Sequence, residues 1–203
     1  RCCSSAASDV YKRQYLENFK SPTNPKNLYE PVSYILGLKG KRIRPILTLL
    51  TCDIFNDNHK SALDAALAVE VFHNFSLVHD DIMDEAPIRR GNQTVHKKWD
   101  LSTAILSGDV MLILAYQLFE NYSGNTFVSL AELFSKTAIE VCEGQQMDID
   151  FSKKVDVSAE EYLKMIEYKT AVLIGASMKM GAIVAGASEK DQNNIYEFGK
   201  NLG

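Results

Sequence analysis

Acidic and basic side chains follow one another at the end of a largely apolar stretch of this chain. Asp80, Asp81 and Asp84 come first, and Arg89 and Arg90 follow them closely. On a helix, positions i and i+4 share a face one turn apart, so two of the carboxylates repel unless a cation lies between them. Carboxylate oxygens suit Mg²⁺, and arginine pairs grip phosphate. The pattern therefore predicts a site for a metal-bound diphosphate.

The simplest alternative is a solvated acidic helix end, because a DDxxD string on its own is weak support for a site. Two features favour the site. The residues before the aspartates are mostly apolar, which predicts a buried helix whose terminal carboxylates need a cation. The Arg89-Arg90-Gly91 sequence that follows supplies anion-binding side chains at the same end.

A second basic segment lies earlier in the chain. Lys41, Arg42 and Arg44 stand beside Gly40 and before Pro45, a residue favoured in the first turn of a helix. Cations at a helix start form an anion site, although a solvated charge run has the same composition. The segment is therefore a second candidate for binding phosphate.

Further candidates have little support from the residues alone. His73 precedes Asp80 by about two helical turns on the same face, but a single histidine on an apolar helix is more often part of a core. Lys169 and Thr170 interrupt an otherwise apolar region. These residues become candidates only in combination with the acidic and basic segments.

The elements that must position these residues are predicted to be helices. A long, buried helix over Lys60–Met83 presents the aspartates and is ended by Pro87. The other expected helices are Tyr15–Phe19, Leu28–Leu36, Ile46–Phe55, Ser102 or Thr103 to Phe119 with an interruption near residues 107–109, Phe127–Asp150, one opened by a capping box at Ser158–Glu161, Thr170–Gly186 and Ala187–Leu202. The expected fold is all-α, a large antiparallel helical bundle with a central cavity.

Composition narrows the class of protein. The 203 residues are 46% hydrophobic and 24% charged, with a net charge of −4, which argues against broad nucleic-acid binding. The four cysteines show no metal-type spacing, which predicts a reducing, cytoplasmic environment. The longest apolar tract, Ala171–Ala187, is interrupted by Ser177 and Lys179, so we expect no membrane span.

The two ends of the chain shape the expected domain organisation. Residues 1–14 carry no initiating Met and no periodicity, and we treat them as a non-native or disordered lead. Residues 15–203 are expected to form part of one all-α domain, which stops just after an amphipathic stretch.

Four motifs of the sequence together resemble those of a known family. Gly40–Pro45 (GKRIRP), Asp80–Asp84 (DDIMD), Arg89–Gly91 (RRG) and Lys169-Thr170 occur in the order and approximate spacing of the trans-isoprenyl diphosphate synthases, or polyprenyl synthetases. The chain from about residue 28 resembles the first two-thirds of a geranylgeranyl or farnesyl diphosphate synthase. The resemblance implies condensation of isopentenyl diphosphate with an allylic diphosphate, in a Mg²⁺-dependent homodimer.

The resemblance also implies a role for each motif residue. Lys41, Arg44, His73 and Arg90 would bind isopentenyl diphosphate. Asp80 and Asp84 would bind Mg²⁺ that bridges to the allylic diphosphate, with Asp81 supporting them. Arg89, Lys169 and Thr170 would contact the allylic diphosphate itself.

Product length is also implied, because bulk just before the first aspartates limits it in this family. Phe75 and Ser76 occupy those positions here, and we expect a C15 or C20 product. The family's second aspartate-rich motif would follow Gly203, so we expect these 203 residues alone to have little or no activity.

Three other functions remain open. An HD-type metal phosphohydrolase would use His79-Asp80 but gives no role to the two basic segments. A class I terpene cyclase shares the DDxxD chemistry but has no second diphosphate site. A non-catalytic partner subunit is a third possibility. Binding of isopentenyl diphosphate through Lys41 and Arg44 would distinguish a synthase from all three.

Overall fold

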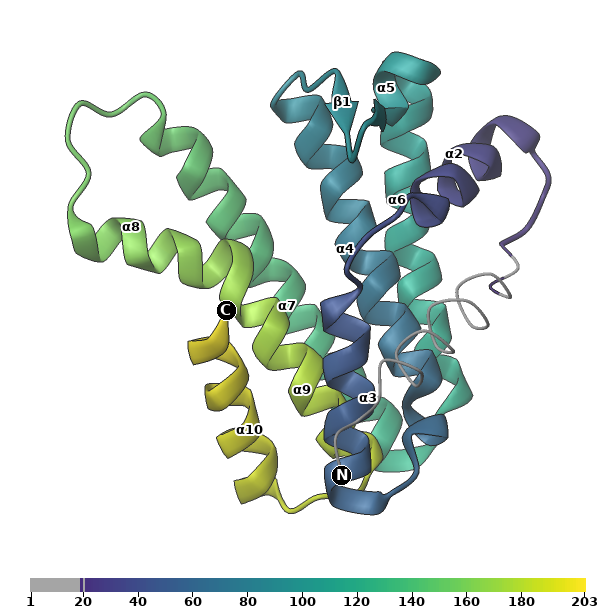
Figure 1. The fold of residues 1–203 in the computed structure, drawn as a ribbon, viewed down its shortest axis with the longest axis vertical. Coiled ribbons are helices and arrows are strands. Elements are labelled where there is room, and N and C mark those ends of the chain that lie inside the picture. Colours follow the sequence, from purple (N-terminus) through teal and green to yellow (C-terminus); the bar gives the residue numbers. More distant parts are fainter. Residues whose placement is uncertain (1–18, 20) are drawn as a thin grey trace. The chain divides into compact units, whose positions relative to one another are not determined.

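The computed structural model describes Phe19 and residues 21–203, which are almost entirely helical (Figure 1). The helices are α2 (Lys26–Gly37), α3 (Ile43–Asn56), η1 (His59–Ala62), α4 (Leu63–Met83), α5 (Val95–Lys98), α6 (Leu101–Gln117), η2 (Leu118–Asn121), α7 (Gly124–Phe151), α8 (Ala159–Ile166), η3 (Glu167–Ala171), α9 (Val172–Val184) and α10 (Glu189–Leu202). Strands β1 (Ile88–Arg89) and β2 (Asn92–Gln93) form one short hairpin. The all-α prediction is confirmed. The predicted lead at 1–14 and most of the predicted helix at 15–19 lie outside the described residues.

The chain forms two compact units. The first comprises the described residues up to Ile43 together with Leu67–Leu118, and the second comprises Arg44–Ala66 together with Phe119–Gly203. Most of α4 therefore belongs to the first unit, with α2, the hairpin, α5 and α6. Helices α3 and α7–α10 belong to the second unit.

The first unit is built around the apolar residues of α4. Val69, Val71 and Phe72 are buried, as are Val32 of α2 and Met111 of α6. Helices α2 and α6 contact each other, and the hydroxyl of Ser107 donates to the carbonyl of Leu28 at 3.0 Å. This packing explains why α4 is apolar nearly all round.

Helix α4 ends at Met83, as the sequence predicted, but a capping motif ends it before Pro87 is reached. The amide of Ala86 donates to the carbonyl of Asp81 at 2.9 Å, and the amide of Glu85 donates to that of Ile82 at 3.2 Å. Glu85 has a φ of 49°, the left-handed conformation that this Schellman arrangement requires and that glycine usually supplies. The last turn of α4 is therefore fixed before Pro87 is reached.

Helix α6 is continuous, so the predicted interruption near residues 107–109 is wrong. Asp100 caps its start by accepting a hydrogen bond from the amide of Thr103 at 2.8 Å. A Cβ at Gly108 would lie 2.3 Å from Nε2 of His79, and the same nitrogen lies 3.2 Å from the carbonyl oxygen of Ile105. Gly108 therefore makes room for α4 and does not break the helix.

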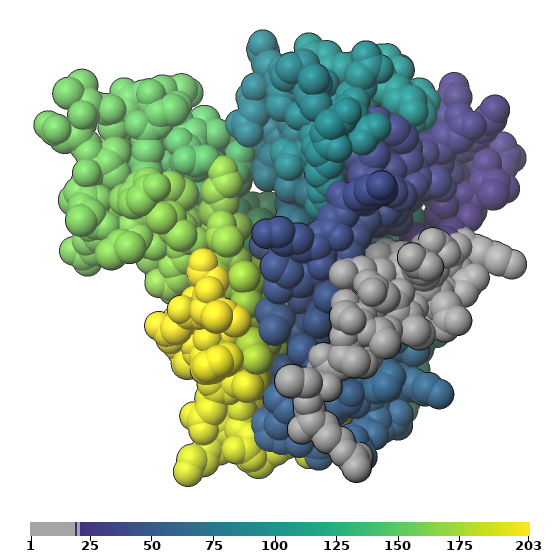
Figure 2. All heavy atoms as spheres, viewed as in Figure 1, coloured from purple at the N-terminus to yellow at the C-terminus, as the bar shows by residue number. Residues whose placement is uncertain are grey.

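The second unit relies on close helix contacts at glycines. A Cβ at Gly181 of α9 would lie 2.1 Å from the carbonyl oxygen of Thr48 in α3, and one at Gly199 of α10 would lie 2.9 Å from the Cα of Gly175. The small residues of α9 thus let α3 and α10 approach its backbone. In the space-filling view the yellow atoms of α10 form a continuous surface with those of α9 (Figure 2). The predicted capping box at Ser158–Glu161 is present at the start of α8.

Among the described residues, the stretch Leu101–Asn121 is long and apolar enough to be a candidate membrane span by length and composition alone. This stretch was not expected, because the apolar tract considered from the sequence was Ala171–Ala187. A third of the most apolar part of the stretch is buried within the protein.

The contact between Gly108 and His79 can be tested by Gly108→Ala. We expect this variant to lower the free energy of unfolding by about 2 kcal/mol, because the new methyl group overpacks the contact. Gly37→Ala is the control, since a Cβ there meets no atom within 4 Å. Urea denaturation followed by circular dichroism measures both variants. Equal stability of the two variants would contradict this account of α6.

Candidate functional site

The acidic cluster lies at the carboxyl end of α4, in the first unit. Asp80 is half-buried, Asp81 is buried and Asp84 is exposed. The amide of Asp84 donates to the carbonyl of Asp80 at 2.8 Å, so the i, i+4 geometry predicted for this pair continues just past the last helical residue. A helix carboxyl end carries partial negative charge, which makes it an unfavourable place for carboxylates. The carboxylates of this cluster therefore need nearby cations to stabilise their charge.

Arg89 supplies one such cation through a partly buried ion pair with Asp81. Its Nε lies 2.8 Å from both carboxylate oxygens, and its Nη2 lies 2.7 Å from Oδ1. The side chain of Asp81 is only 1% exposed. Its hydrogen bonds raise the pKa of Arg89 above the usual value. Asp81 therefore holds Arg89 at the end of α4.

The hairpin that carries Arg89 turns at Arg90 and Gly91, which have φ values of 52° and 78°. Positive φ at both turn residues suits a two-residue hairpin but is unfavourable for arginine. The phenolic hydroxyl of Tyr34 in α2 donates to the carbonyl of Gln93 at 2.7 Å, and the hydroxyl of Thr94 donates to that of Ala86. These contacts hold the hairpin in place, so Arg90 keeps a strained backbone of the kind that often marks a functional site.

Arg90 lies against the basic segment. A Cβ at Gly40 would lie 3.0 Å from Nη1 of Arg90, so the guanidinium covers the backbone of Gly40. Arg90 is exposed overall, but the partial burial of its guanidinium lowers its pKa, and the nearby charge of Arg42 lowers it further. A cation placed near another cation is a favourable binding partner for an anion.

The basic segment divides by burial and by unit. Lys41 is exposed and Arg42 is buried, both in the first unit, whereas the half-buried Arg44 begins the second unit. His73 is half-buried on α4, and its carbonyl accepts a hydrogen bond from the hydroxyl of Ser76 at 2.9 Å. The structure thus places Gly40, the residue before Lys41, against the guanidinium of Arg90.

Lys169 and Thr170 lie in the second unit, on the single π-helical turn η3. The ammonium of Lys169 pairs with the carboxylate of Asp148 on α7. A Cβ at Gly144 would lie 2.3 Å from the amide nitrogen of Lys169, so α7 and η3 touch backbone to backbone. Isolated π-turns of this kind are frequent at functional sites.

Gln145 lies in the polar end of the helix predicted over Phe127–Asp150, a group that the sequence left open as either cavity-lining or exposed, and it is buried on α7 without a hydrogen-bond partner for either amide atom. A buried polar group in this state calls for an explanation, such as a ligand or water. The pairing of Asp148, in the same polar group, with Lys169 was not predicted from the sequence. The available signal was the group of polar residues at the end of an otherwise amphipathic helix.

The residues proposed for chain length lie on different sides of α4. The ring of Phe75 packs against Phe72 and His79, with centroids 5.5 and 4.9 Å apart. Ser76 precedes Asp80 by one turn and so shares its face. Phe75 therefore lies on the face of α4 that meets α6, and Ser76 lies directly below the acidic cluster.

The donor set at the end of α4 suits magnesium that arrives with a phosphate ligand. Within the described residues, no three His, Cys, Asp or Glu side chains form a group that could hold a metal ion. Mg²⁺ is commonly held by one or two protein carboxylates, with waters and substrate phosphates completing its shell. Asp80 and Asp84 supply that number of carboxylates, whereas Asp81 is paired with Arg89.

Comparison with known proteins places these features in a family. The polyprenyl synthetase family model matches residues 25–203. The chain belongs to the polyprenyl synthetase family. It is 40% identical to a geranylgeranyl diphosphate synthase of Methanosarcina mazei over 183 residues, covering 89% of this chain and 56% of that protein. It is also 40% identical to one of Sulfolobus acidocaldarius over 192 residues, covering 93% of this chain and 58% of that protein.

Solved structures agree with this assignment. A crystal structure of a geranylgeranyl pyrophosphate synthase matches with a TM-score of 0.95 and 54% identity, covering 98% of this chain and 61% of that one. A geranylgeranyl pyrophosphate synthetase from Geoglobus acetivorans matches with a TM-score of 0.91 and 35% identity, covering 97% of this chain and 64% of that one. The chain thus spans less than two thirds of the length of these relatives.

The buried pair of Asp81 and Arg89 makes a clear prediction about stability. Arg89→Met should lower the free energy of unfolding by about 3 kcal/mol, because it leaves a buried carboxylate without its partner. Arg90→Met is the matched control, since Arg90 is exposed on the same hairpin, and it should change stability far less. Chemical denaturation measures both. An effect of Arg89→Met no larger than that of Arg90→Met would show that the pair is not needed for stability.

Proposed function

We propose that this chain supplies the diphosphate-binding and magnesium-binding part of a short-chain prenyl diphosphate synthase. The reaction is the head-to-tail condensation of isopentenyl diphosphate with an allylic diphosphate to a C15 or C20 product. The observation that carries the proposal is the position of Arg90, which lies against Gly40 among other cations, close to the acidic end of α4. The names of the relatives, geranylgeranyl diphosphate synthases, support the same chemistry.

The chemistry requires charge neutralisation and exclusion of water. The allylic C–O bond breaks and its electron pair leaves with the diphosphate. The double bond of isopentenyl diphosphate then attacks the allylic cation, and a proton is lost. Asp80 and Asp84 would hold Mg²⁺, which would supply positive charge that stabilises the leaving diphosphate. Water must be kept away because it would trap the cation.

The cationic residues divide between two diphosphates in this proposal. Lys41, Arg44, His73 and Arg90 bind isopentenyl diphosphate, whereas Lys169 and Thr170 bind the allylic diphosphate. Arg89 contacts the allylic diphosphate with the edge that its pair with Asp81 leaves exposed. The exposed position of Lys41 and the half-buried positions of Arg44 and Lys169 support these assignments.

The rival functions fit the structure less well. A phosphohydrolase of the HD type would present His79 beside Asp80 for metal binding. The ring of His79 instead packs on Phe75, and its Nε2 lies 3.2 Å from the carbonyl of Ile105 and 3.7 Å from the carboxylate of Asp109. A non-catalytic partner subunit gives no reason for these cations to bind isopentenyl diphosphate, so the titration described below tests that alternative as well.

A cytoplasmic homodimer is the assembly that we propose. Helix α6 exposes apolar side chains along one side, with Leu106 59% exposed and Ile113 56% exposed. Leu101 and Ile105 of the same helix are also exposed. A second copy that covers these side chains would remove them from water, which is the usual meaning of such a patch.

Binding of isopentenyl diphosphate tests the proposed function directly. Isothermal titration of the chain in the presence of Mg²⁺ should show saturable binding. Arg90→Ala should weaken it about tenfold or more, because a charge-assisted phosphate contact is lost. Lys39→Ala is the control, since Lys39 is an exposed cation on the same loop with no proposed role. Absence of binding, or equal losses in the two variants, would contradict the proposal.

The chain-length hypothesis can be tested by comparing allylic diphosphates of increasing length. Phe75→Ala should improve the affinity for geranylgeranyl diphosphate relative to farnesyl diphosphate, because it removes an aromatic ring five residues before Asp80. Ser76→Phe should have the opposite effect, since it adds a ring on the face of Asp80. Competition titrations measure both ratios. If neither ratio changes, these positions do not limit the prenyl chain.

A further inference from the structure

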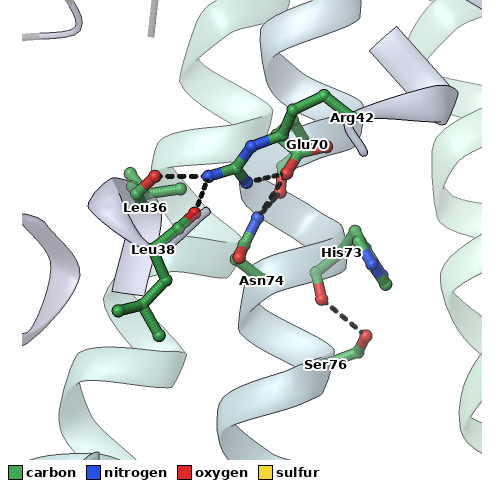
Figure 3. Close-up of polar contacts among 7 residues, drawn as sticks. All are labelled: Leu36, Leu38, Arg42, Glu70, His73, Asn74 and Ser76. Carbon is green, nitrogen blue, oxygen red and sulfur yellow. Dashed lines mark hydrogen bonds and ion pairs between the residues drawn. The ribbon is translucent and has the colours of Figure 1, made fainter. Parts of the chain in front are cut away.

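Arg42 differs from the other cations of the basic segment because it is turned inward. Its side chain is 7% exposed, whereas the neighbouring Lys41 is exposed. The guanidinium pairs with Glu70 of α4 and donates to the carbonyls of Leu36 and Leu38, both at 2.6 Å (Figure 3). Its donors are therefore used within the protein and are not directed at a ligand.

Glu70 is a buried carboxylate in the middle of an apolar helix, with a side chain that is 2% exposed. Asn74, one turn later, donates from Nδ2 to Oε1 of Glu70 at 2.8 Å. Figure 3 shows Glu70 and Asn74 directed toward Arg42, whereas the ring of His73 points away from them. A buried carboxylate is tolerated only with partners of this kind, so the position of Glu70 depends on Arg42.

The network fixes the backbone of residues 36–42. The carbonyl of Leu36, near the end of α2, and the carbonyl of Leu38, just after it, accept hydrogen bonds from one guanidinium group, which sets the path of the chain between them. Arg42 itself has a φ of 51°, an unfavourable conformation for a non-glycine residue that persists only where other contacts hold it. Within this fixed loop Gly40 lies against the guanidinium of Arg90.

We propose that Arg42, with Glu70 and Asn74, is a positioning residue for diphosphate binding. It holds the loop so that Lys41 and the surface of Gly40 stand beside Arg90, and it makes no contact with the ligand. The proposal rests on the proposed function of the Lys41 and Arg90 site. It assigns a role to a buried ion pair that neither diphosphate nor metal binding uses.

The direction in which Glu70→Gln changes the affinity for an anion distinguishes a positioning role from a purely electrostatic one. Glu70→Gln removes a negative charge close to the proposed anion site, so charge alone predicts tighter binding of an anion. Loss of positioning predicts weaker binding, because the neutral amide no longer holds the Arg42 guanidinium as an ion-pair partner. With inorganic pyrophosphate and Mg²⁺ as the probe, we expect the dissociation constant to rise about tenfold.

Arg42→Lys provides a second variant that keeps a buried cation opposite Glu70. A lysine cannot bridge Glu70 and two carbonyls with a planar fork, so we expect a similar loss of affinity although the net charge is unchanged. Lys39→Ala is the control and should bind as the unaltered chain does. Circular dichroism confirms that each variant is folded at the titration temperature, and Arg42→Lys decides the question if Glu70→Gln does not fold.

The outcomes are distinct. Weaker binding in the folded variants, with an unaltered control, supports positioning by Arg42. Equal or tighter binding by Glu70→Gln, or by Arg42→Lys where Glu70→Gln does not fold, overturns the positioning proposal and leaves the proposed function intact. Failure of the unaltered chain to bind pyrophosphate overturns the proposed function, and the positioning proposal falls with it.

Discussion

Two buried ion pairs on helix α4 determine how the candidate site is built. Arg42 pairs with Glu70 in the middle of the helix, and Arg89 pairs with Asp81 near its end. Both carboxylates are almost fully buried, and a buried charge is costly unless a partner stays in place. Each pair therefore ties a neighbouring segment to α4: the basic loop in one case and the hairpin in the other.

The division between paired and exposed charges gives the site its chemistry. Arg42 and Asp81 are used in holding the structure, whereas Lys41 and Asp84 are exposed beside them. Carboxylates close to one another repel, as do neighbouring cations, and a ligand that carries both a metal ion and phosphate relieves both repulsions. Arg42, Glu85 and Arg90 have positive φ values. Such strained conformations persist only where surrounding contacts hold them, here the hydrogen bonds of Arg42, the helix cap and the hairpin.

Part of this could be predicted from the sequence. The apolar pattern of Lys60–Met83 predicted the central helix, and the aspartate and arginine motifs predicted that acidic and basic side chains meet at its carboxyl end. The sequence did not show that Arg42 is buried. Lys41, Arg42 and Arg44 are neighbouring cations, and only the backbone conformation determines which of them faces the protein interior. The signal was Glu70, an acid within an apolar helix and one turn before Asn74. Gly108 was misinterpreted as a break, since a glycine that permits close packing looks the same as one that ends a helix.

The central claim is that Lys41, Gly40 and Arg90 form one binding site for diphosphate beside the end of α4. A crystal structure of the chain grown with Mg²⁺ and inorganic pyrophosphate tests it most directly. The account predicts pyrophosphate oxygens within hydrogen-bond distance of the Arg90 guanidinium and the Lys41 ammonium. Pyrophosphate bound only elsewhere, with Arg90 and Lys41 in contact with solvent alone, would contradict it.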